Sequence, residues 1–354
     1  MEAFERLLEY AVLVTDSDEN GTETPSTPQQ HILARRLAEE MEAMGLAQVY
    51  ADEHAYAYGR LPATPGREDA TPIGFIAHLD TVPVPPDTPI RPAVIRDYDG
   101  GELPLGDSGR TLSPAMFPHL PSLRGETLIV TDGRTILGAD DKAGVAEILT
   151  ALERLMASGE PHGPISVCFP PDEEIGHGAA LLDLERFGAR YAYTVDGGDV
   201  EEIEFETFNA AAAKWEIRGV SVHPGSAKDT MINAASIAAE IVTALPREET
   251  PERTEGYEGF YHLCHMEGDV SRAELSFIIR DHDRAKFEAR KAVMAKLAQE
   301  VNARYGPGTA SVEIRDQYYN MEEVLRDCPE VLDKARAALR ELGMTPVSHP
   351  VRGG

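Results

Sequence analysis

The chain has 354 residues, of which 61 are acidic and 33 are basic, giving a formal net charge of −28 at pH 7. A surface this negative repels phosphate backbones, which excludes nucleic acid as an expected partner. We find no run of about 18 apolar residues, and the N-terminal residues are acidic where a secretory signal would be basic. The three isolated cysteines give no disulfide framework, so we expect a cytoplasmic protein that does not contact membranes.

The first 200 residues show an alternation of helices and strands. Apolar residues recur at helical spacing over residues 30–44 and again over residues 143–156. Short apolar runs typical of buried strands occupy residues 73–77, 127–131, 165–169 and 191–195. This alternation predicts an α/β layer with a largely parallel sheet.

Polar clusters follow each of these four predicted strands. The clusters are His78-Leu79-Asp80, Asp140-Asp141, Asp172-Glu173-Glu174 and Asp196-Gly197-Gly198. The carboxyl ends of the strands in an open α/β sheet form its ligand crevice. We therefore expect the four clusters to converge in space.

The pattern changes after residue 208. Predicted elements follow in the order strand 214–220, helix 231–245, strands 260–266 and 273–279, a long helix from Phe287 to Tyr305, and strand 311–315. The order β-α-β-β-α-β is that of a ferredoxin-like unit. We predict a first catalytic part over residues 1–208, an inserted lid or dimerisation domain over 209–318, and a second catalytic part over 319–354, which includes a helix at 329–342.

The chemistry of the clusters favours a metal site. A single acidic pair is weak evidence, because this composition gives roughly ten such pairs by chance and most are solvated turns. Several carboxylates crowded around one histidine would repel each other unless a cation neutralised them. His78 and Asp80 lie two positions apart, so Asp80 can accept the second imidazole N–H and orient the ring. Oxygen and imidazole ligands suit Zn²⁺, with Mn²⁺ or Co²⁺ as substitutes.

Four segments of the chain resemble the co-catalytic di-zinc peptidases and deacylases. They are residues 78–82 (HLDTV), 137–144 (LGADDKAG), 171–176 (PDEEIG) and 193–198 (YTVDGG). Segments at 209–210, 223–228, 255–263, 278–281 and 318–321 extend the resemblance to the peptidase T family of tripeptide aminopeptidases. The resemblance implies a zinc-peptidase-like mixed sheet flanked by helices, with an inserted ferredoxin-like α+β domain.

The resemblance also implies two Zn²⁺ ions per subunit and a role for each site residue. Asp140 would bridge the ions, His78 and Asp196 would complete the first, and Glu174 would bind the second. Glu173 would be the general base, and Asp80 would be the hydrogen-bond partner of His78. The Asp140–Asp141 peptide is a candidate for the cis bond of such sites.

The inserted domain is expected to supply the substrate contacts. His223 is implied to stabilise the oxyanion, in several relatives from the partner subunit of a homodimer that forms through this domain. Arg280 and Asn233 are candidates for the substrate's carboxylate and backbone, and Arg352 is a further substrate-binding candidate. The alternatives are that Asn233 caps its own helix and that Arg280 is an ordinary surface residue of a strand.

The chain departs from the family pattern at its C-terminal end. The family's last metal ligand is a histidine located beyond an Arg-Gly-Gly motif, and the sequence stops at Arg352-Gly353-Gly354. We therefore expect a truncated sequence that binds the second ion weakly and has low or no activity.

Three functional readings remain open from sequence. The first is a metallo-aminopeptidase that releases the N-terminal residue of tripeptides. The second is a di-zinc amidohydrolase of another specificity, such as a dipeptidase, a carboxypeptidase-like enzyme or an N-acyl-amino-acid deacylase. The third is an inactive fragment that persists as a binding or dimerisation module.

Overall fold

A computed structural model describes residues 1–353. It forms two compact units: unit 1 spans Met1–Gly197, and unit 2 begins at Gly198. Within the described residues no helix combines the length and apolar character needed to cross a bilayer. The predicted division at residues 208 and 318 differs from this single boundary and stays a prediction.

Unit 1 is built on a five-stranded sheet in the order β1-β2-β8-β3-β9. The strands are β1 (Ala47–Ala51), β2 (Ala57–Leu61), β3 (Ile73–Ile76), β8 (Ile165–Phe169) and β9 (Tyr191–Thr194). β3 runs parallel to β8 and β9, whereas β2 pairs antiparallel with β1 and β8. The mixed sheet implied by the resemblance is confirmed. The expectation of a largely parallel sheet is wrong, because β1 and β2 add two antiparallel pairings and neither strand has an apolar run that marks it in the sequence.

The predicted strand at 127–131 forms but does not join this sheet. It is β7 (Leu128–Thr131), which pairs antiparallel with β4 (Pro92–Ile95) in a separate two-stranded sheet. A second small sheet, of β5 (Leu103–Leu105) and β6 (Arg110–Leu112), and a short 3-10 helix, η1 (Leu120–Leu123), lie nearby in sequence. An apolar run predicts a strand but not its pairing partner. The prediction that strand 127–131 joins the main sheet and brings the Asp140 cluster to its edge is therefore wrong.

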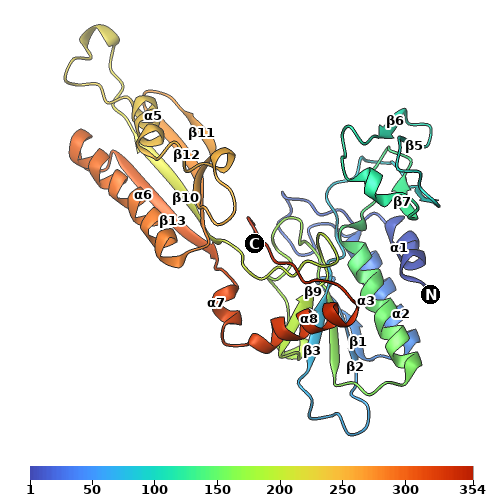
Figure 1. The fold of residues 1–354 in the computed structure, drawn as a ribbon. Coiled ribbons are helices and arrows are strands. Elements are labelled where there is room, and N and C mark those ends of the chain that lie inside the picture. Colours follow the sequence, from blue (N-terminus) through green and yellow to red (C-terminus); the bar gives the residue numbers. More distant parts are fainter. Residues whose placement is uncertain (354) are drawn as a thin grey trace. The chain divides into compact units, whose positions relative to one another are not determined.

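Helices cover the sheet of unit 1 unequally (Figure 1). The larger core lies between the sheet and α1 (Ala3–Ala11), α2 (Gln30–Met44) and α3 (Ala139–Ser158). The opposite face carries a smaller cluster of Tyr56, Tyr58, Cys168 and Phe187, the last from α4 (Leu184–Phe187). Successive residues of a strand face opposite sides of a sheet, so β2 supplies Ala57 and Leu61 to the first core and Tyr58 to the second.

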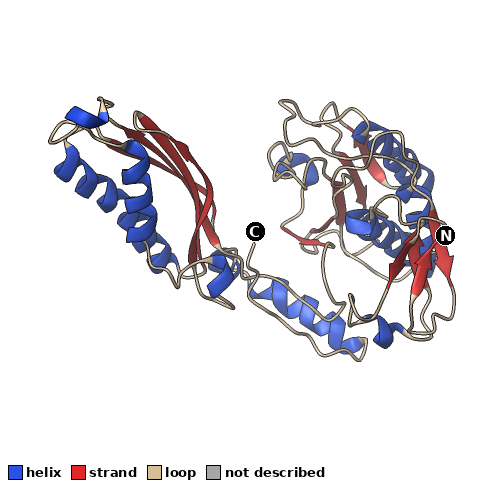
Figure 2. Cartoon of the chain, turned by 90° about the horizontal axis from the view of Figure 1, so that it is seen from above, coloured by secondary structure: helices blue, strands red, loops and turns tan. Residues whose placement is uncertain are grey.

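Unit 2 contains the predicted β-α-β-β-α-β unit. Its elements are β10 (Asn209–Arg218), α5 (Ala234–Ala244), β11 (Phe260–Gly268), β12 (Arg272–Asp281), α6 (Arg284–Tyr305) and β13 (Ala310–Tyr318). The strands form an antiparallel sheet in the order β11-β12-β10-β13, with α5 and α6 on one face (Figure 2). Alternate residues of β10 and β12, among them Trp215 and Phe277, fill the core beneath these helices.

The remaining elements of unit 2 connect this sheet to the chain's last residues. They are η2 (Pro224–Ser226), η3 (Pro251–Arg253), α7 (Glu322–Leu325) and α8 (Pro329–Glu341), the last within the helix predicted at 329–342. Beyond α8 the chain runs beside residues 201–208: Val347 N–H donates to Glu201 O at 2.9 Å, and Val351 N–H donates to Glu206 O at 2.9 Å. The segment that precedes β10 in the chain thus pairs with the segment that follows α8.

Candidate metal centre

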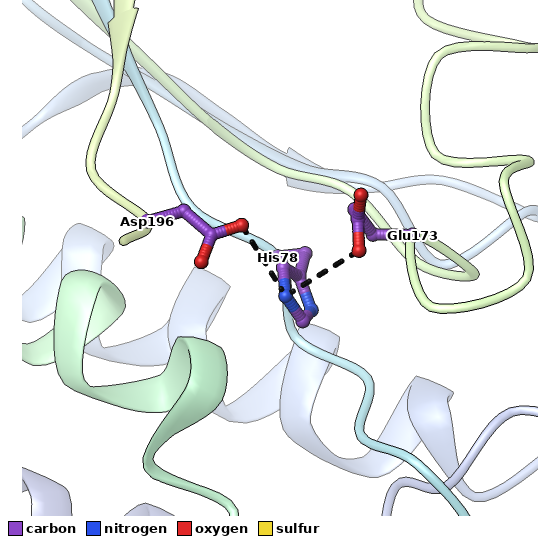
Figure 3. A group of neighbouring side chains, drawn as sticks. All are labelled: His78, Glu173 and Asp196. Atoms are coloured by element: carbon purple, nitrogen blue, oxygen red, sulfur yellow. Dashed lines mark ion pairs between the residues drawn. The ribbon is translucent and has the colours of Figure 1, made fainter. Parts of the chain in front are cut away.

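His78 lies at the centre of a group of carboxylates in unit 1. It follows β3, while the Glu173-Glu174 pair and Asp196 follow the neighbouring strands β8 and β9. His78 Nε2 lies 3.7 Å from Glu173 Oε2 and 3.6 Å from Asp196 Oδ2 (Figure 3). Asp140, from the N-terminal turn of α3, places Oδ1 3.0 Å from the same nitrogen. The predicted convergence is therefore observed, although one cluster arrives from a helix.

Asp80 connects the histidine to the glutamate pair. Its Oδ1 lies 3.2 Å from His78 Nδ1, as predicted. The same carboxylate accepts the backbone N–H of Glu173 at 3.0 Å and that of Glu174 at 3.2 Å. Asp80 is fully buried and His78 is 2% exposed, so both are fixed by their surroundings. One carboxylate thus orients the ring and holds the loop that carries both glutamates.

The start of α3 approaches β9 very closely. A Cβ atom at Gly144 would lie 2.0 Å from the carbonyl oxygen of Val195, the residue before Asp196. The buried Asp141 accepts the N–H of Gly144 at 3.3 Å and that of His78 at 3.0 Å. The Asp140–Asp141 peptide is cis, as the resemblance implied. A glycine is needed here because any side chain would separate Asp140 from Asp196.

The carboxylates raise one another's affinity for protons. Burial, together with the negative charge of Asp196, raises the pKa of Asp141 to about 9. Burial followed by neighbouring carboxylates also raises the pKa values of Glu173, Glu174 and Asp196. Burial alone would lower the pKa of His78, but Asp80 and its neighbours outweigh that effect and raise it to about 10. Negative charge accumulates here beyond what one imidazolium can balance.

Two sets of donors in this group suit a metal ion. They are His78, Glu173 and Asp196, and His78, Asp140 and Glu174, with donor atoms within 4.8 Å of one another in each set. Imidazole nitrogen and carboxylate oxygen are ligands of Zn²⁺ and similar divalent ions. The excess negative charge and the partial exposure of the carboxylates, 72% for Asp140 and 49% for Glu173, fit a cation that enters from solvent.

The four predicted substrate residues all belong to unit 2, and each of them has partners within that unit. Asn233 caps α5 by accepting the N–H of Ser236 at 3.1 Å, which is the alternative role considered above. Arg280 donates to the carbonyl oxygen of Ala211 at 3.2 Å. Arg352 donates to the carbonyl oxygens of Gly256 at 2.9 Å and Glu258 at 2.8 Å.

His223 is exposed in the loop that leads from β10 to α5. Its Nδ1 accepts the N–H of Gly225 at 3.1 Å. A neutral imidazole that accepts at Nδ1 carries its proton on Nε2. His223 can therefore donate a hydrogen bond outward, the property that a group stabilising an oxyanion needs.

Sequence reasoning missed two buried residues next to the centre. Lys142 is fully buried and donates to the carbonyl oxygen of Leu13 at 2.6 Å. Asp172 is also fully buried and contacts Ser26 and Gln30, more than 140 positions earlier. Its place beside Glu173 was the available signal, but no local pattern predicts such distant partners.

Comparison with known proteins places the chain in a family. A model described as "Peptidase dimerisation domain" matches residues 205–309. The chain is 49% identical over 352 residues to peptidase T of Bacillus licheniformis and 48% identical over 355 residues to that of Bacillus velezensis, and each match covers 86% of the relative. The crystal structure of aminopeptidase PepT from Bacillus cereus aligns with a TM-score of 0.71 at 26% identity, over 100% of this chain and 85% of that one.

The fold and the relatives together define an α/β peptidase with an inserted dimerisation domain. The chain belongs to the peptidase T family. It is accordingly an enzyme of the metallo-aminopeptidase class.

Proposed function

We propose that the protein removes the N-terminal residue from tripeptides by metal-dependent hydrolysis at the His78 centre. The observation that carries the proposal is the gathering of four carboxylates, Asp140, Glu173, Glu174 and Asp196, around one buried histidine in a chain of the peptidase T family. The tripeptide preference rests on the resemblance of the unit 2 segments to that family.

The residues of the centre would hold two divalent ions, most simply Zn²⁺. By the family resemblance, His78 and Asp196 would bind the first, Glu174 the second, and Asp140 would be shared. The two donor sets of the structure contain these four residues, but they place Glu173 beside His78 and Asp196, so the assignment of Glu173 as base and not ligand rests on the resemblance. Two such ions supply a water of lowered pKa and polarise the scissile carbonyl. The described residues thus give the first ion three protein ligands and the second two, so we expect the first to bind more tightly.

Glu173 would act as the general base. Adjacent residues point in different directions, so one member of the pair can ligate while the other faces the water. Glu173 would accept a proton from the attacking water and would pass it to the amine nitrogen of the leaving peptide as the C–N bond breaks. The raised pKa of Glu173, due first to burial, suits a group that must accept and then release a proton.

The resemblance implies that residues of the inserted domain contact the substrate. The Nε2–H of His223 would donate to the oxyanion. Arg280, Asn233 and Arg352 would bind the substrate's carboxylate and backbone, with guanidinium groups suited to a carboxylate by their paired donors. The match to a peptidase dimerisation domain over residues 205–309 supports a homodimer formed through this region.

Two substitutions in the glutamate pair test the assignment of roles. Glu173→Gln should keep its metal content and lose at least about 100-fold in kcat, because a general base contributes about 10²–10⁴. Glu174→Gln should instead lose the weaker ion. Metal content by mass spectrometry and kcat on Ala-Ala-Ala separate the two outcomes. Full activity of Glu173→Gln would refute the base assignment.

A substrate panel tests the specificity. Ala-Ala-Ala, Ala-Ala and N-acetyl-alanine differ in length and in their free N-terminus. The proposal predicts the highest kcat/KM for the tripeptide. Preference for the dipeptide or the acylated amino acid would assign the centre to a different amidohydrolase reaction.

A further inference from the structure

Asp172 stands at a sharp turn in the chain, immediately before the glutamate pair. Its φ angle is +56°, in the left-handed region that costs most residues about 1 kcal/mol or more. The next two backbone N–H groups, those of Glu173 and Glu174, both donate to Asp80. The conformation of Asp172 therefore decides whether both amides can reach that carboxylate.

The side chain of Asp172 is held by three hydrogen bonds from an early part of the chain. Its Oδ2 accepts the backbone N–H of Ser26 at 2.8 Å. Its Oδ1 accepts the hydroxyl of Ser26 at 2.6 Å and the side-chain NH₂ of Gln30 at 2.6 Å. Gln30 in turn accepts the backbone N–H of Asp172 at 3.1 Å. Asp172 and Gln30 are both fully buried, so water cannot replace these bonds.

The two buried aspartates act on opposite sides of the same loop. Asp80 holds the two amides that follow the turn, and Asp172 ties the turn itself to Ser26 and to α2. A third anchor follows the pair, where the hydroxyl of Tyr56 donates to Gly178 O at 3.0 Å. Asp172 makes none of its side-chain contacts with the groups around His78.

We propose that Asp172 is a positioning residue, which, through Ser26 and Gln30, holds the Glu173-Glu174 loop in the geometry that hydrolysis requires. The inference rests on the proposed function, in which Glu173 is the base. It deepens that function by assigning a role to a buried carboxylate outside the reacting groups.

The hydrogen-bond pattern makes a specific demand for a carboxylate. In Asp172→Asn the new NH₂ group would face either the N–H of Ser26 or the NH₂ of Gln30, and both are donors. Gln30 cannot turn its amide without losing the acceptor for the N–H of residue 172. Asparagine tolerates the left-handed conformation, so the substitution changes the hydrogen bonds and not the preference of the backbone.

Exchanging the two groups should restore the pattern. Gln30→Glu alone would set one carboxylate against another. In the double variant Asp172→Asn/Gln30→Glu, the amide at position 172 can donate to the carboxylate at position 30, which still accepts the backbone N–H of residue 172. A matched control is Gln29→Glu, which adds the same charge at the neighbouring exposed position.

Amide hydrogen exchange in the metal-free protein measures loop order without reference to activity. Asp172→Asn should speed exchange in peptides that cover residues 172–178, and the double variant should restore wild-type exchange. In the metal-loaded enzyme, Asp172→Asn should lower kcat by about 10- to 100-fold with KM within about twofold, because a small misplacement of a catalytic group costs up to about 100-fold. The double variant should recover most of that loss.

Unchanged exchange and kcat in Asp172→Asn would overturn the inference, as would a double variant no better than either single one. If Asp172→Asn does not fold, Ser26→Ala serves instead; it removes one of the three bonds to the Asp172 side chain, together with the bonds that the hydroxyl accepts from Asp18 N–H and the Gln30 NH₂ group. This variant should show the same shifts in exchange and kcat at smaller size, and unchanged exchange in residues 172–178 would equally overturn the inference. Retained activity of Glu173→Gln would refute the proposed base and leave the exchange result standing.

Discussion

In unit 2 the buried carboxylate of Asp281 lies against a guanidinium, since Arg290 Nε is 2.8 Å from its Oδ2. In unit 1 the carboxylates around His78 mainly face one another, and burial with mutual repulsion raises the pKa values of Glu173 and Asp196. A buried charge with a partner contributes to a folded structure, whereas a crowd of like charges opposes it. The contrast indicates that the ends of β3, β8 and β9 are arranged to bind a cation.

Two histidines show the same contrast. In unit 1, Asp80 and its neighbours raise the pKa of His78 to about 10 against the effect of burial. In unit 2, burial lowers the pKa of His282, which packs on the ring of Phe208. One environment thus favours positive charge and the other excludes it.

The largest effect is expected from Asp140→Asn. Loss of a residue that only orients a ligand costs about 10- to 100-fold in metal affinity or activity, so loss of Asp140, the ligand that we propose both ions share, should cost more than about 100-fold in kcat/KM. Metal content should fall with it. The measurement is metal analysis together with Ala-Ala-Ala hydrolysis.

The matching substitution in unit 2 is Asp316→Asn, which removes an ion pair with Lys291 at 2.8 Å. This pair is partly exposed, so we expect a loss of less than about 1 kcal/mol in unfolding free energy and no change in metal content. Equal loss of metal in both variants would contradict the contrast between the units.

A pair of glycines gives the next largest effect. A Cβ atom at Gly144 would lie 2.0 Å from Val195 O, and one at Gly219 would lie 2.0 Å from Val270 O. Alanine at either position should cost about 1–3 kcal/mol of unfolding free energy, the usual cost of overpacking. Gly144→Ala should in addition weaken metal binding, because it pushes the start of α3 away from Asp196.

Chemical denaturation and metal titration of the two alanine variants separate these effects. Gly219→Ala should bind metal like the wild type. If Gly144→Ala also keeps wild-type metal affinity, the close approach of α3 and β9 does not hold the metal ligands together.

The smallest effect concerns pH and unit 2. The pKa of His282 is lowered in the folded chain, so the unfolded chain takes up the proton first as pH falls. The contribution of the neutral His282 ring to the free energy of unfolding is complete above its unfolded pKa of about 6.5 and is lost as pH falls below that value. His282→Gln keeps an N–H that can donate to Val351 O, as the ring Nε2 does at 3.0 Å, and removes the titration.

Denaturation midpoints of wild type and His282→Gln at about pH 8 and about pH 5 test this sign. Lowering the pH should decrease the denaturation midpoint of the wild type more than that of His282→Gln. A shift in favour of the wild type would mean that His282 gains a proton more easily in the folded chain.

Much of the centre could be predicted because its residues lie in short segments next to recognisable strands. His78, Asp80 and the glutamate pair follow β3 and β8 directly, and apolar runs marked both strands. The helix at 30–44 was predicted at its observed bounds because its apolar spacing and the glycine at 45 agree. The β-α-β-β-α-β unit was predictable for the same reason, because the apolar residues within each element recur at the spacing typical of a helix or of a strand.

The features that the sequence did not predict depend on contacts between residues far apart in the chain. The run at 127–131 forms β7, but β7 pairs with β4, an earlier strand separated from it by β5, β6 and η1, and not with the main sheet. Asp140 comes to the centre from the start of α3. The Ser26–Asp172 and Gln30–Asp172 contacts join positions 146 and 142 residues apart. No local period encodes such contacts, and they are fixed when α2 packs onto the sheet.

Calorimetric titration of the metal-free chain with Zn²⁺ tests the central claim most directly. We predict one tight binding step and one weaker step, with the tight step lost in His78→Ala, because the ligands that we propose among the described residues number three for one ion and two for the other. No Zn²⁺ binding, or the same binding in His78→Ala as in the wild type, would contradict the claim that the carboxylates around His78 form a metal centre.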